Sequence, residues 1–129
     1  MAPQDRVEIT ARMVPSQWRD GMTFEQFMAS ETACGAEIEI SNRSERTVKE
    51  VRVALEVYRP GDSKNEAPES FNELVYTAVL SPGGRRVECV HFPDHLQVRR
   101  AHGGTLVLNV KRRRVQFYEP GEFVPTSAK

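Results

Sequence analysis

Alternation of apolar and polar residues is the clearest pattern along this chain. From Cys34 to Asn42, every second residue is small or apolar and the residues between them are mostly polar. A period of two places alternate side chains on opposite faces of an extended strand, so the pattern predicts a half-buried β-strand. Residues 50–58 repeat it with valines and a leucine. Polar residues 42–45 predict a turn between the two strands, which we expect to form a hairpin.

Further strands are predicted on both sides of this hairpin. Residues 6–13, 71–80 and 85–92 alternate in the same way, and residues 105–111 are apolar enough for a central strand covered on both faces. Residues 113–118 are expected to form the last strand. Six to eight short strands predict an all-β fold, namely an immunoglobulin-like antiparallel β-sandwich.

One short helix is expected at about residues 23–30, between the first and second strands. Thr23 can cap it, and Gln26 has the spacing that completes a capping box. A chain of 129 residues fits one domain. Residues 1–118 are expected to form a single sandwich, and residues 119–129 a flexible C-terminal tail.

Composition places the chain among ordinary globular proteins. Hydrophobic residues make up 39% and charged residues 28%, and no apolar run approaches the roughly 20 residues that a membrane span needs. The first residues have neither the basic start nor the apolar stretch of a secretory signal. We therefore expect a cytoplasmic location, or a secreted one if a leader has been removed.

Two turns carry a resemblance to a known family. Asn42 and Ser44 begin the first turn, a valine-rich strand follows, and Leu80, Pro82 and Gly83 form an L-x-P-G turn before a further strand. This order resembles the small bacterial immunoglobulin-like domains of the FxLYD and CARDB type and spans about residues 36–92. The resemblance implies a β-sandwich, and such domains are usually accessory or adhesive modules of exported proteins.

Charge is unevenly distributed although the net charge is zero. Residues 1–80 carry 9 Lys and Arg against 14 Asp and Glu, whereas residues 81–129 carry 9 against 4. A dipolar molecule would result unless early and late strands alternate in the sheets. The most basic run is Lys111, Arg112, Arg113 and Arg114, followed closely by two aromatic residues. Such a run can bind a polyanion such as nucleic acid, protect an exposed sheet edge, or pair with the acidic half.

Three side chains in one stretch could bind a metal ion. Cys89, His91 and His95 offer a thiolate and two imidazoles, as zinc or copper would require, although their spacing matches no familiar ligand motif. The alternative is a buried cysteine with histidines at the edge of a loop. Cys89 could instead pair with Cys34 across the two sheets, in an oxidising compartment. No cofactor is expected.

Aromatic and methionine residues gather before the second predicted strand, at Trp18, Met22, Phe24 and Phe27. They can pack over an open end of the core, or, if exposed, anchor a partner protein.

Catalytic motifs are missing from the sequence. It contains no nucleophile elbow, phosphate-binding loop or zinc-protease motif. We therefore expect a non-enzymatic module that binds a protein partner or itself through an edge strand, the N-terminal segment or the loop at 59–69. Polyanion binding by Lys111–Arg114 is the alternative, and metal binding comes third.

Overall fold

The computed structural model describes residues 2–14, 21–23, 25–26, 34–93, 95–96 and 106–125. Six strands form in this part of the chain: β1 (Val7–Met13), β2 (Cys34–Asn42), β3 (Val48–Tyr58), β4 (Leu74–Leu80), β5 (Arg85–His91) and β6 (Val107–Phe117). Two 3-10 turns, η1 (Pro3–Arg6) and η2 (Glu69–Asn72), precede β1 and β4. The predicted all-β class is confirmed.

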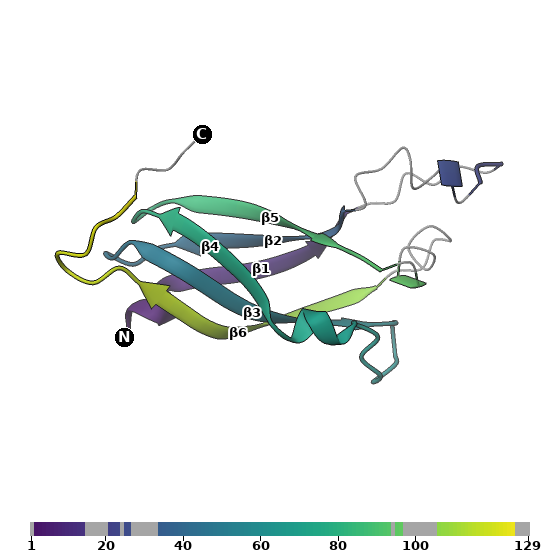
Figure 1. The fold of residues 1–129 in the computed structure, drawn as a ribbon. Coiled ribbons are helices and arrows are strands. Elements are labelled where there is room, and N and C mark those ends of the chain that lie inside the picture. The colour runs from purple at the N-terminus through teal and green to yellow at the C-terminus, as the bar shows by residue number, and fades with distance from the viewer. Residues whose placement is uncertain are drawn as a thin grey trace.

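The strands form two antiparallel sheets of three strands each (Figure 1). Sheet A has the order β1-β2-β5, and sheet B has the order β4-β3-β6. The expected hairpin of β2 and β3 is therefore wrong, because the turn between them carries the chain from one sheet to the other. Each of the two strands becomes the centre of its own sheet.

The core lies between the two sheets and follows the predicted alternation. Its fully buried side chains come mainly from the central strands: Ala36, Ile38 and Ile40 of β2, and Val48, Val51, Val53, Leu55 and Val57 of β3. A central strand has neighbours on both sides, so its inward side chains are covered more completely than those of an edge strand. The charged side chains between them, such as Glu39 and Arg52, point to the outer faces.

The last strand differs most from its prediction. Residues 107–117 form one continuous strand instead of two, and it lies at the edge of sheet B, with Val107 48% exposed. The pairing with β3 shifts where Arg52 faces Arg114 and Val53 faces Arg112, which leaves Arg113 as an extra residue. This β-bulge shifts the alternation of β6, so the sequence pattern resembles the end of a strand.

The predicted helix at about residues 23–30 is described only in part. Of its residues, Glu25 and Gln26 are described as helical. The Thr23 N–H donates to Gln26 Oε1 at 3.0 Å and the Gln26 N–H donates to Thr23 Oγ1 at 3.1 Å, which is the predicted capping box. The rest of that helix lies outside the described residues. No helix in the described ranges has the length and apolar character to cross a membrane.

Candidate functional site

Four strands lie at the edges of the two sheets and define two sides of the molecule. β1 and β6 are neighbours on one side, and β4 and β5 are neighbours on the other (Figure 1). Edge strands carry unpaired backbone N–H and C=O groups, which another chain can bind. The two sides are therefore the first places to look for an interaction site.

The β1–β6 side is closed by one arginine. Arg112 Nη1 donates to the carbonyl oxygen of Gln4 and, at 3.5 Å, to that of Val7, and Arg112 Nη2 lies 3.1 Å from Asp5 Oδ1. A single guanidinium thus joins β6 to η1 and to the first residue of β1. Because it makes three hydrogen bonds within the chain, this side chain is a structural clamp.

The other residues of the basic run also have partners. Lys111 Nζ lies 3.1 Å from Glu56 Oε2, and Arg113 Nε donates to the Asn72 carbonyl oxygen at 3.4 Å. Arg114 donates to the side-chain oxygen of Gln116 at 2.7 Å when that amide is oriented to satisfy both of its neighbours. The three arginines still share one hollow of about 350 Å³, lined by Gln4, Asp5 and residues 112–115. The structure therefore gathers three of the four predicted basic residues in one hollow, and each of the four has a partner within the chain.

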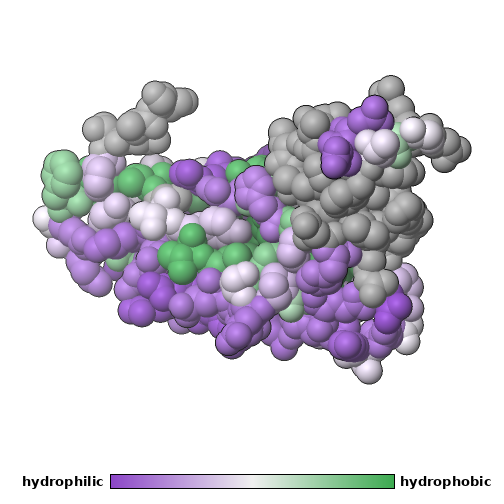
Figure 2. All heavy atoms as spheres, turned by 45° about the vertical axis from the view of Figure 1, so that its right-hand side comes forward, coloured by the Kyte–Doolittle hydropathy of each residue, from purple (hydrophilic) through white to green (hydrophobic). Residues whose placement is uncertain are grey.

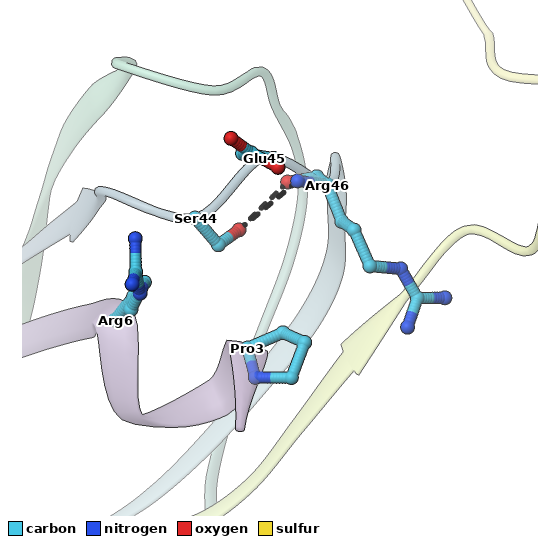
Figure 3. A pocket seen from close by; sticks show the side chains of 5 residues that line it. All are labelled: Pro3, Arg6, Ser44, Glu45 and Arg46. Carbon is cyan, nitrogen blue, oxygen red and sulfur yellow. Dashed lines mark hydrogen bonds between the residues drawn. The ribbon is translucent and has the colours of Figure 1, made fainter. Parts of the chain in front are cut away.

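A second hollow lies at the end of the molecule beside η1. It has a volume of about 320 Å³ and is lined by Pro3, Arg6, Ser44, Glu45 and Arg46. Figure 3 shows that the Arg46 guanidinium points away from it. That guanidinium lies 5.0 Å from the centre of the Phe117 ring and donates to the Tyr118 carbonyl oxygen at 3.2 Å. The sequence gives no signal for this hollow, because η1 is far from Ser44 along the chain.

Asn42 explains the two turns that carry the family resemblance. Its side chain is almost fully buried, and its Nδ2 donates to the carbonyl oxygens of Arg46 at 2.8 Å and Leu80 at 2.9 Å. Its Oδ1 accepts from the N–H and the hydroxyl of Ser44. The Gly83 N–H donates to the Asn42 carbonyl oxygen at 2.7 Å. One side chain and its backbone therefore tie the β2–β3 turn to the β4–β5 turn.

The β4–β5 side has a different character from the β1–β6 side. β4 contains no charged residue, and Val75 is 44% exposed. On β5, Val87 is also 44% exposed and lies between Arg86 and Glu88, which form an ion pair. Figure 2 shows apolar groups as separate green areas between polar ones on the face in view. Val107 of β6 is similarly exposed, so it is the uncharged sequence of β4 that favours this side as the interaction site.

Tyr76 connects β4 with β5 electrostatically. Burial, and after it the nearby carboxylate of Glu88, raise the pKa of its hydroxyl to about 12. Glu88 lies opposite the buried Ile38 in the sheet register, so its side chain points toward the core side of β5. A charged residue therefore lies at the inner edge of this side.

Cys89 is bonded to Cys34, which corrects two expectations. The disulfide joins neighbouring strands of sheet A, not the two sheets, because β2 and β5 pair directly. Its thiol is therefore not free to bind a metal ion, and His95 Nε2 lies 3.0 Å from the Glu66 carbonyl oxygen. Within the described ranges, no three His, Cys, Asp or Glu side chains gather as a metal site.

The aromatic segment at the N-terminus cannot be placed in the same way. Trp18, Phe24 and Phe27 lie outside the described residues, and Met22 is half-buried. Its role as a partner site stays a prediction.

The comparisons with known proteins find no relative of this chain. No protein-family model, curated protein or solved structure matches the chain.

Proposed function

We propose that this chain is a non-enzymatic protein-interaction module with an immunoglobulin-like sandwich fold. The strand orders support the fold: β1-β2-β5 corresponds to strands A, B and E of such sandwiches, and β4-β3-β6 to C′, C and F. The family resemblance of the Asn42 and Leu80 turns is consistent with this assignment. The proposed role is to bind an extended segment of a partner along the β4–β5 side.

The absence of charge on β4 carries the proposal. The other three edges contain charged residues: Glu8 and Arg12 on β1, Arg85, Arg86 and Glu88 on β5, and residues 111–114 with a bulge on β6. Natural proteins use charges and bulges to stop unwanted strand pairing. β4, which runs Leu-Val-Tyr-Thr-Ala-Val-Leu, has only a shift of its pairing with β3 near Val48. It is the edge best suited to accept another strand.

Two substitutions on β4 test this proposal. Val75 lies opposite Arg52 and Thr77 lies opposite Glu50, so Val75→Glu and Thr77→Lys place charges beside opposite charges within the same sheet. The double variant is expected to fold and to lose partners that the wild-type protein retains from a lysate, identified by mass spectrometry. Val107→Glu, at a similarly exposed valine on β6, is the matched control and should retain them. Equal retention by the wild-type and β4 variants would overturn the proposal.

A polyanion-binding role is the second candidate, because Arg112, Arg113 and Arg114 line one hollow. A polyanion there would compete with Asp5 for Arg112. A salt-dependent mobility shift with nucleic acid that disappears in the variant with Ala at 112, 113 and 114 would support it. No shift at low salt would exclude it.

A further inference from the structure

The outer edge of β5 carries two opposite charges, one on either side of a single residue. Arg86 and Glu88 flank Val87, and both point to the core side of sheet A because they lie opposite Ile40 and Ile38. They remain partly exposed, at 46% and 23% of their side chains, since β5 is the last described strand of its sheet on this side. Arg86 Nε donates to Glu88 Oε1 within the chain.

An antiparallel pair of identical β5 strands would make this pattern complementary. Residues that lie opposite each other in a sheet point to the same face. A two-fold axis that relates two identical antiparallel strands must therefore place one residue opposite its own copy. With the axis at Val87, Arg86 of one copy lies opposite Glu88 of the other, twice. An axis at Arg86 would oppose two guanidinium groups, and an axis at Glu88 would oppose two carboxylates. Only the axis at Val87 pairs opposite charges and brings the two exposed valines together.

We propose that the chain self-associates through the outer edges of two β5 strands, related by a two-fold axis at Val87. This inference rests on the proposed interaction role of the β4–β5 side and names its partner as a second copy of the chain. Sheet A then continues across the interface as β1-β2-β5-β5-β2-β1. The second copy covers the side on which β4, with its exposed Val75, also lies.

Protection of the edge is the competing interpretation of these charges. A single inward-pointing charge on an edge strand prevents pairing, because it would be buried beside a neighbouring strand. The pair on β5 has both signs, on either side of Val87, so a second copy places an opposite charge beside each one instead of a like charge.

β1 is the informative comparison, because it carries a similar pattern. Glu8 and Arg12 are symmetric about Thr10. On this edge, however, Arg112 occupies the carbonyl oxygen of Val7 and that of Gln4 beside it. The clamp therefore leaves β5 as the symmetric edge that is accessible in the described part of sheet A.

Charge reversal on β5 tests the proposal. Sedimentation equilibrium of the full chain over a wide concentration range should show a reversible monomer–dimer equilibrium. Arg86→Glu and Glu88→Arg should each weaken self-association roughly tenfold, because each places like charges opposite each other at two symmetric positions. A mixture of the two variants should form a heterodimer, and the double variant Arg86→Glu/Glu88→Arg should dimerise again. Glu8→Arg on β1 is the matched control and should dimerise as the wild type does.

A crosslink locates the axis. Val87→Cys should give an intermolecular disulfide between the two copies, identified by peptide mapping, whereas Thr10→Cys should not. Thermal unfolding of each variant shows that it is folded. A monomer at every concentration, or a dimer insensitive to reversal at Arg86 and Glu88, overturns the inference. If the chain is monomeric but the Val75→Glu/Thr77→Lys variant still loses the partners that the wild type retains, the proposed function stands. If the chain is monomeric and this variant loses none of them, the proposed function and the self-association are both contradicted.

Discussion

Asn42 shows what one buried polar side chain does in this molecule. It satisfies two carbonyl oxygens and accepts two hydrogen bonds from Ser44, all at the end of the core where two turns meet. An apolar residue of similar size would fill the space but leave these groups without partners. The residue is therefore needed for its hydrogen bonds and not for its volume.

Asn42→Leu is expected to lower the free energy of unfolding by about 2 kcal/mol or more, since buried carbonyl oxygens would lose their donors. Urea denaturation measures the change. Asn109→Ala removes an exposed amide that donates to Glu56, and should cost less than about 0.5 kcal/mol. Similar losses in both variants would contradict the role of Asn42.

The raised pKa of Tyr76 predicts that the stability of the fold changes at alkaline pH. Its pKa is raised from 10.0 to about 12 by burial and by Glu88, so the fold favours the neutral hydroxyl. The contribution is complete below about pH 10, where the unfolded chain is also neutral, and is lost as the pH rises toward about 12. The unfolding temperature of the wild type should fall across this interval more steeply than that of Tyr76→Phe. Parallel curves would show that Tyr76 does not titrate in this way.

At the scale of elements, the disulfide holds an edge strand to a central one. It joins the first residue of β2 to Cys89 near the end of β5, with the two Cα atoms 5.6 Å apart. The closed loop spans 55 residues and includes β3 and β4. The crosslink therefore limits the unfolded chain over most of both sheets.

Cys34→Ser/Cys89→Ser is expected to lower the free energy of unfolding by about 2–4 kcal/mol, because a long loop gains freedom in the unfolded state. Chemical denaturation in the absence of reductant measures this, and reduction of the wild type should produce a similar loss. Two reactive thiols in the untreated wild-type protein would contradict the crosslink.

The same elements show what the sequence predicts and where it fails. Alternation is a local property, so β2, β5 and the capping pair of Thr23 and Gln26 appear at the predicted residues. Pairing depends on residues far apart in the chain, which is why the hairpin of β2 and β3 was wrong. The bulge at Arg113 shifts the alternation of β6 and made one strand look like two. The uncharged run of β4 is visible in the sequence, but only the sheet order shows that it lies at an edge.

At the scale of the whole molecule, the sheets mix the acidic and basic halves of the chain. β5 and β6 come late in the sequence, and each pairs with a strand from the acidic half of the chain. Arg85 thus lies 2.6 Å from Glu39, and Lys111 lies 3.1 Å from Glu56. The dipole that the sequence allowed is therefore reduced by pairing between the halves.

Acid is expected to destabilise this arrangement. The pKa of Glu50 is lowered by a hydrogen bond from Arg52, that of Glu56 by bonds from Asn109 and Lys111, and that of Glu122 by the Glu119 N–H and Lys49. Lowered values mean that the stabilisation is present above about pH 4.5 and is lost as the pH falls through the folded-state values. Thermal unfolding from neutral to acid pH should show the decline. It should be smaller in Glu50→Gln/Glu56→Gln, and an equal decline would contradict the assignment.

The covalent link between β2 and β5 also has a mechanical consequence. An unlinked edge strand under tension can peel away, breaking its hydrogen bonds one after another. Here a pull exerted by a partner on β5 passes through the Cys34–Cys89 bond into the centre of sheet A. β5 cannot separate from β2 at Cys89 unless a covalent bond breaks, so the edge proposed to meet a second molecule is also anchored against force at that end.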